Sequence, residues 1–185
     1  MSGRAAVTGR LRMKNLLIAI VVLGAIGLAA AWYAGALSPV TITDEFAGPY
    51  YVVYEDNMGS YGLLDEKIKD VQKTLTDGNV PYTDGIAVIN SDPISTPPDQ
   101  LQSIGGVIVS GPVALTDSKL AQKIITYDHY AVVTFNGFTM LGLNHVYPKV
   151  YEWMKANGKT LGWPVLEIHT GDGMKKQIKY MFPFK

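Results

Sequence analysis

One residue pattern occurs twice along this sequence, and the repetition constrains the fold more than any other feature. Each copy has the periodicity of strand, helix, strand, strand, at 50–55, 63–75, 85–90 and 104–109 in the first copy and at 130–135, 141–154, 165–169 and 177–182 in the second. The two helical patterns are followed by Gly78 and Gly158, which are helix-stop signals. The order of elements therefore indicates an internal duplication.

Equivalent positions in the two copies are 78 to 80 residues apart, as in Gly59 with Gly137, Val71 with Val150, Leu75 with Met154, Ile86 with Leu166, and Asp92 with Asp172. We expect an α+β fold in which two tandem β-α-β-β repeats, 44–110 and 123–185, form one antiparallel sheet with pseudo-twofold symmetry. Both helices would cover one face of that sheet, because each carries a single apolar stripe. The groove between the repeats is then the natural pocket.

An uncharged apolar segment precedes this domain. Residues 16–37 contain no charged side chain, and 22 residues make roughly 33 Å of helix, which is long enough to cross a bilayer. Trp32 and Tyr33 lie near its end, where aromatic rings favour the headgroup level. We therefore expect a transmembrane anchor at 16–37 and a domain at 44–185.

The charges around this segment predict its orientation. The N-terminal segment 1–15 contains four basic residues and no acid, whereas Asp44 and Glu45 are the first charges after the anchor. This asymmetry predicts a cytoplasmic N-terminus and an extracytoplasmic domain. A cleaved signal peptide is the alternative, with Met13 as a second candidate start, and it also exports the domain.

The composition of the domain excludes several classes of function. Four of the 16 basic residues precede the anchor, so 12 remain against all 16 acidic residues, and the domain carries a net charge of −4. We therefore expect no nucleic-acid partner. The sequence has no cysteine, which excludes disulfides, thiolate nucleophiles and iron–sulfur ligation.

No motif for a metal or cofactor is present, so none is expected. The three histidines, at 129, 145 and 169, are too far apart in sequence to form a helical ligand pair. Gly105-Gly106 lies in an apolar run without a following helix start, which favours a strand bulge over a phosphate loop. Asp92 and Asp172 have the sequence context of turn residues that close a strand.

One acidic residue lies in an unusual place. Glu167 interrupts the apolar run Val165–Ile168, and its equivalent in the first repeat is the neutral Ala87. Strand alternation alone favours a solvent-facing Glu167 with Leu166 and Ile168 in the core. The alternative is a carboxylate at the bottom of an aromatic cleft, which requires a compensating cation or hydrogen-bond donor. Both interpretations remain open at the level of sequence.

Aromatic residues are abundant in the domain. Most are expected in the core, but so many tyrosines also suit a wet cleft in which flat or cationic ligands stack. The candidate ligand-binding residues are Glu167, Trp153, Tyr54, Tyr61, Tyr130 and Phe138.

Several short motifs resemble the GyrI-like domain, the fold of gyrase-inhibitor-like proteins and of the effector-binding domains of multidrug-responsive regulators. The similarity covers essentially all of 44–185 and rests on Val53-Tyr54, Met58-Gly59-Ser60-Tyr61-Gly62, Asp92-Pro93, Pro97-Pro98-Asp99, Thr134-Phe135, Trp153 and Leu166-Glu167-Ile168. The resemblance implies that Glu167 lies in the cleft and binds cationic, often aromatic, ligands, with Trp153 and Tyr54 at aromatic pocket positions. It also implies hydrolysis as an alternative, because some members hydrolyse strained electrophiles with this carboxylate and a nearby tyrosine.

The chain is also similar to membrane-anchored members of the family that act as ER-phagy receptors. It ends at Lys185, directly after the last expected strand, without the disordered tail through which those receptors engage the autophagy machinery. That role is therefore not implied.

Three functional hypotheses follow. The first is a membrane-anchored binding module for an amphipathic or cationic small molecule. The second is a hydrolase of electrophilic small molecules with Glu167 as general base and a tyrosine as acid. The third is an adaptor whose groove holds a protein or peptide partner.

Overall fold

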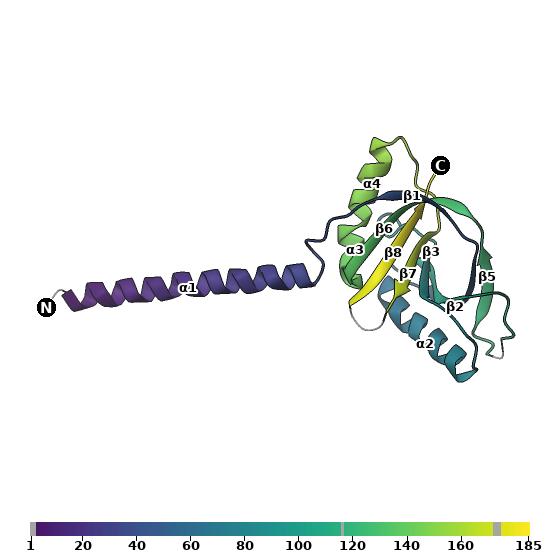
Figure 1. Ribbon diagram of the computed structural model, residues 1–185, viewed down its shortest axis with the longest axis horizontal. Coiled ribbons are helices and arrows are strands. Elements are labelled where there is room, and N and C mark those ends of the chain that lie inside the picture. Colours follow the sequence, from purple (N-terminus) through teal and green to yellow (C-terminus); the bar gives the residue numbers. More distant parts are fainter. Residues whose placement is uncertain (1–2, 116, 172–174) are drawn as a thin grey trace.

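The computed structural model describes residues 3–115, 117–171 and 175–185, and for residues 3–14, 138–140, 175 and 176 it describes the backbone alone. A long helix, α1 (Gly3–Tyr33), extends away from a domain that contains all the other elements (Figure 1). Its segment Asn15–Tyr33 is long and apolar enough to cross a membrane. The apolar segment expected at 16–37 is therefore helical only as far as Tyr33, and residues 34–37 form a turn.

The described residues of the domain form eight strands and three α-helices. In chain order they are β1 (Thr43–Ala47), β2 (Tyr50–Met58), the 3-10 turn η1 (Tyr61–Leu63), α2 (Leu64–Asp77), β3 (Gly85–Ile89), β4 (Gln102–Val109), β5 (Ala121–Ile125), β6 (Asp128–Phe138), α3 (Thr139–His145), α4 (Tyr147–Ala156), β7 (Val165–Thr170) and β8 (Lys175–Pro183).

The sheet has the two-repeat organisation expected from sequence. All strands pair antiparallel in the order β1-β6-β8-β7-β3-β4-β2-β5. The first repeat supplies β2, β4 and β3, and the second supplies β6, β8 and β7 in mirrored order, so β3 and β7 meet at the centre. Their register places Ala87 opposite Glu167, which are equivalent residues of the two repeats. The pseudo-twofold axis therefore passes beside Glu167, and the expected fold class is confirmed.

Both faces of the sheet are buried. One face packs against the helices, because a single core cluster joins Ile68 of α2 to Val150 and Met154 of α4. The other face forms a second cluster that includes Ile86 and Leu166 of the two central strands. β1 lies at one edge of the sheet and is followed directly by β2 near the other edge, so the sheet curls around this second cluster (Figure 1).

α2 is held against the sheet by its apolar stripe and by a glycine beneath it. Leu64, Ile68, Val71 and Leu75 are all buried on one side of the helix. A Cβ at Gly105 would lie 2.7 Å from the Lys67 Cβ and 3.1 Å from the Leu64 carbonyl oxygen. Gly105 therefore permits close helix–sheet packing, and the bulge expected at Gly105-Gly106 is wrong, because β4 keeps regular pairing with both neighbours there.

The second repeat departs from the single helix expected at 141–154. The segment forms two helices, α3 and α4, separated at Val146, with Pro148 at the start of α4. Proline has no backbone N–H to donate to the preceding turn, and its ring clashes there, so it is favoured at the first turn of a new helix. The break lets α3 follow β6 directly while α4 covers the sheet.

The edge strands β1 and β5 were not expected from sequence. β5 alternates between intermediate and exposed residues, and it begins in the stretch between the two expected repeats and continues into the start of the second. Asp92 has the predicted turn role, since its carboxylate accepts hydrogen bonds from the Ile94 amide and the Ser95 hydroxyl. Asp172 lies outside the described residues.

Candidate functional site

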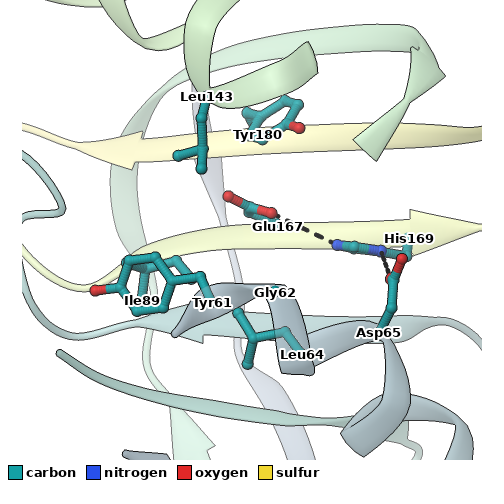
Figure 2. Close-up of a pocket in the computed structure, with 9 residues that line it drawn as sticks. All are labelled: Tyr61, Gly62, Leu64, Asp65, Ile89, Leu143, Glu167, His169 and Tyr180. Atoms are coloured by element: carbon teal, nitrogen blue, oxygen red, sulfur yellow. Dashed lines mark ion pairs between the residues drawn. The ribbon is translucent and has the colours of Figure 1, made fainter. Parts of the chain in front are cut away.

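A cavity of about 260 Å³ lies between α2, α3 and the centre of the sheet. Figure 2 shows its floor, where Glu167 and His169 project from β7 beside Tyr180 of β8, while Leu143 of α3 lies on the opposite side from α2. The nine lining residues are Tyr61, Gly62, Leu64, Asp65, Ile89, Leu143, Glu167, His169 and Tyr180. They include two carboxylates and no lysine or arginine.

Glu167 occupies the floor of this cavity and is only 7% exposed. Its neighbours across the central strands are Ala87 and Tyr180. Strand alternation does operate, since Leu166 and Ile168 face the second core cluster. The solvent-facing interpretation is nevertheless wrong, because the face to which Glu167 alternates is covered by helices rather than by water.

The buried carboxylate of Glu167 has a hydrogen-bond donor from α4. The Tyr147 hydroxyl donates to Glu167 Oε1 at 3.0 Å, and both residues are buried. Burial raises the pKa of Tyr147 well above its ordinary value of 10, and the Glu167 charge and the hydrogen bond raise it further. The phenol therefore stays protonated and remains a donor to the carboxylate.

His169 joins Glu167 to a second carboxylate. Alternation places Glu167 and His169 on the same face of β7, and their side chains approach to 3.6 Å between His169 Nε2 and Glu167 Oε2. On the other side of the ring, His169 Nδ1 is 3.4 Å from Asp65 Oδ1 in the first turn of α2. Figure 2 shows this row of carboxylate, imidazole and carboxylate along the floor. Both distances exceed those of ordinary N–H···O hydrogen bonds, so neither ring nitrogen has a hydrogen-bond partner among the described residues, and the contacts become ion pairs when His169 is protonated.

The two carboxylates determine the ionisation of this buried imidazole. Burial alone lowers the pKa of His169, but the interactions with Asp65 and Glu167 outweigh it, and the pKa is raised above its ordinary 6.5. A pKa raised by folding means that the folded state binds the proton more tightly than the unfolded chain. The contribution to stability is therefore complete below pH 6.5 and is lost as the pH rises through the folded-state pKa.

We expect the unfolding free energy of the chain to decrease between pH 6 and pH 9 because of His169. Urea unfolding at both pH values measures this slope, and the window lies below the titration of the tyrosines. His169→Gln should flatten the slope, because glutamine does not titrate. His129→Gln, which changes a solvent-exposed histidine, should keep it. An identical slope in wild type and His169→Gln would show that His169 does not hold the extra proton.

Two tyrosines supply aromatic walls. Tyr61 lies in η1, and its hydroxyl donates to the Ser91 carbonyl oxygen at 2.6 Å. Burial raises the pKa of Tyr61 to about 12. Burial also raises the pKa of Tyr180, with the Glu167 charge as the next cause. Both rings are therefore neutral near the carboxylates at physiological pH.

The structure separates the six residues singled out from sequence. Glu167 and Tyr61 line the cavity together. Tyr54 and Tyr130 pack with the second core cluster on the other face of the sheet, and Trp153 packs beside Phe184 at 6.1 Å between ring centroids. These three residues are not among those that line the cavity. Phe138 ends β6, and its side chain lies outside the described residues.

The lining residues that sequence reasoning missed came mainly from distant segments. Asp65 is in the first repeat and His169 in the second, and only the docking of α2 onto β7 brings them together. One local signal was available. His169 follows Glu167 by two residues in a strand, so the two side chains share a face. Tyr180 and Leu143 carried no comparable signal, and neither did Tyr147, which contacts Glu167 without lining the cavity.

The described residues do not resemble a metal site. No group of three His, Asp or Glu side chains within them is placed to hold a metal ion. A second hollow, of about 220 Å³, lies near the β5 edge and is lined by Tyr51, Val52, Val109, Pro112, Gln122, Lys123 and Ile124. Its lining contains a lysine and no acid, so its charge is opposite to that of the first cavity.

Solved structures with a similar fold include two of EcmrR. An EcmrR–DNA complex determined by cryo-electron microscopy matches with a TM-score of 0.67 and 11% identity, covering 95% of this chain and 69% of that chain. The crystal structure of the EcmrR C-terminal domain matches with a TM-score of 0.64 and 11% identity, covering 79% of this chain and 98% of that one. An uncharacterised conserved protein from Listeria innocua matches with a TM-score of 0.54 and 11% identity, covering 78% and 92% of the two chains.

No protein-family profile matches the sequence, and no curated protein matches it significantly. The structural neighbours belong to the GyrI-like effector-binding fold family, so the fold expected from the sequence motifs is supported. At 11% identity the likeness shows the fold alone.

Proposed function

We propose that this chain is a membrane-anchored binding module that takes a cationic, amphipathic small molecule into the cavity over Glu167. The observation that carries the proposal is a carboxylate, 7% exposed, on the floor of a cavity that has no lysine or arginine among its described lining residues. A buried carboxylate in low-dielectric surroundings attracts a cation strongly, because little water screens it. Tyr61 and Tyr180 supply ring faces on which a flat or cationic group stacks.

Binding is better supported than hydrolysis. A hydrolase of the expected kind pairs Glu167 with a tyrosine that donates a proton to the leaving group. Tyr147 already donates to Glu167 and is not among the cavity-lining residues. The lining tyrosines have raised pKa values, about 12 for Tyr61, which makes them weak acids at neutral pH. No observation favours a peptide adaptor.

Thermal unfolding of the full chain in detergent tests the proposal. The probes are 2-naphthylmethylamine and its neutral counterpart 2-naphthylmethanol, which share one aromatic body and differ in charge. A ligand that binds the folded state raises the melting temperature by mass action. We expect the amine to stabilise the chain and the alcohol to do so much less. Cationic dyes and lipophilic amines that are recovered chemically unchanged after incubation indicate a binding module, whereas their consumption indicates an enzyme. Equal stabilisation by the amine and the alcohol contradicts cation recognition.

We expect the full chain to remain in the membrane with its domain outside the cytoplasm. The reason is that four basic residues precede the apolar segment, whereas the first charged residues after it are acidic. Protease added to intact cells that express the chain should digest the domain, and mass spectrometry of the membrane fraction should recover the N-terminal segment. A domain that resists until the membrane is permeabilised has the inverse topology, and loss of the segment before residue 38 identifies a signal peptide.

A further inference from the structure

The segment between α1 and β1 is docked onto the domain rather than free. A Cβ on Gly35 would lie 2.6 Å from the Asn136 carbonyl oxygen and 3.0 Å from the Gly137 Cα, and a Cβ on Gly137 would lie 2.6 Å from the Ala34 carbonyl oxygen. Only glycine at both positions permits this approach, and Gly35 also has a φ of +87°. The first docked residue, Ala34, directly follows the end of α1, a span of roughly 4 Å between Cα atoms.

Further contacts continue this docking toward the domain core. His145 Nε2 lies 2.8 Å from the Ser38 carbonyl oxygen, within hydrogen-bonding distance. Val40 and Ile42 pack against the core cluster on the helix face of the sheet. Figure 1 shows α1 ending beside the part of the domain that contains α3. The domain is therefore held next to the end of the apolar helix.

The element that receives this segment also forms a wall of the cavity. His145 is the last residue of α3, and Leu143 of the same helix lines the cavity while remaining 38% exposed. Across the cavity, Gly62 is exposed at the rim, and the neighbouring Leu63 is 49% exposed. The cavity thus has an apolar, accessible rim and an acidic floor.

The end of α1 fixes the level of the bilayer surface relative to this rim. Trp32 and Tyr33 are 73% and 57% exposed at the C-terminal end of α1, where aromatic rings mark a membrane interface. The next residues dock on β6 and against His145 of α3, so the α3 side of the cavity, with Leu143, is the side next to the end of α1. β5 lies on the side of the domain away from the end of α1 (Figure 1).

We infer that the cavity is loaded from the bilayer, and that its ligand is a membrane-partitioned amphiphile with a cationic headgroup and a hydrocarbon tail. The inference rests on the proposed anchor and on the proposed cation site. The headgroup reaches the Glu167 carboxylate, and the tail crosses the rim beside Leu143 toward the lipid. An amine of this class is concentrated in the membrane, so a rim that faces the bilayer captures it without passage through water.

Photo-crosslinking in phosphatidylcholine vesicles tests the orientation of the full chain. The photoreactive residue p-benzoylphenylalanine replaces Asn144, which is exposed on α3, and in a matched control it replaces Ile124, which is exposed on β5. We expect several-fold more phospholipid adducts at position 144 than at 124. Equal adduct yields at the two positions, with both variants folded by thermal melting, overturn loading from the bilayer.

A second arm tests the ligand with dodecylamine that carries a diazirine on its tail. In the same vesicles we expect it to label peptides that contain Leu143 or Tyr61, and we expect Glu167→Gln to reduce that labelling at least fivefold. Labelling that depends on Glu167 without lipid adducts at 144 keeps the cation site and refutes the route. Lipid adducts without amine labelling keep the orientation and refute the cation site, and with it the ligand inferred here.

Discussion

Glu167→Gln is expected to weaken binding of a cationic ligand by roughly five- to a hundredfold, which corresponds to about 1–3 kcal/mol. Glutamine keeps the shape of the side chain and removes its charge, so the loss isolates the electrostatic part of recognition. Calorimetric titration of 2-naphthylmethylamine into the full chain measures it. The low exposure of Glu167 makes the effect large, because little solvent screens the interaction.

Two controls make this result specific. Titration with 2-naphthylmethanol should give similar affinities for wild type and Glu167→Gln, since a neutral ligand does not sense the charge. The variant should remain folded, with a stability loss of roughly 1 kcal/mol from the altered contacts with Tyr147 and His169. An unchanged affinity for the amine in a folded variant would remove Glu167 from the recognition site.

Gly105→Val is expected to lower the unfolding free energy by about 3 kcal/mol, with a melting temperature lower by roughly 10 °C. The added Cβ lies 2.7 Å from the Lys67 Cβ and 3.1 Å from the Leu64 carbonyl oxygen. Neither atom can move without a shift of the α2 backbone. α2 must move away from the sheet. Because Leu64 and Asp65 of α2 line the cavity, ligand binding should weaken together with stability.

Gly111→Val is the matched control for this substitution. A Cβ at Gly111 meets no atom within 4 Å, so we expect a change of less than about 0.5 kcal/mol. Urea unfolding compares the two variants. A Gly105→Val protein as stable as the Gly111→Val protein would show that α2 is not held in the close contact described above.

Local patterns in the sequence predicted the main elements, while features that depend on tertiary contacts were missed. The duplicated strand–helix–strand–strand order was predicted correctly because hydrophobic periodicity is a local property of the sequence. β1 and β5 were missed because neither strand has a buried residue, unlike the equally short β3, and the pairing that stabilises an edge strand is not visible in a short sequence window. The break between α3 and α4 had a visible cause in Pro148, which was outweighed by the helical spacing around it.

The candidate site was predictable only in its most unusual residue. Glu167 stood out because an acid within an apolar strand needs a compensating partner. Which partners it has depends on distant segments, since Tyr147 comes from α4 and Asp65 reaches His169 only through the docking of α2. Tyr54 and Tyr130 were assigned to the cleft because they are aromatic. Both faces of the sheet are buried, so aromatic residues alone do not indicate which face carries a cavity.

A crystal structure of the full chain with 6-bromo-2-naphthylmethylamine, grown in a lipidic mesophase, tests the central claim most directly. The bromine atom gives an anomalous signal that locates the ligand independently of its fitted pose. The account predicts a bromine peak in the cavity between Tyr61 and Tyr180, with the amine nitrogen within hydrogen-bonding distance of a Glu167 carboxylate oxygen. A peak in the hollow beside Lys123, or an empty cavity at saturating ligand, would contradict it.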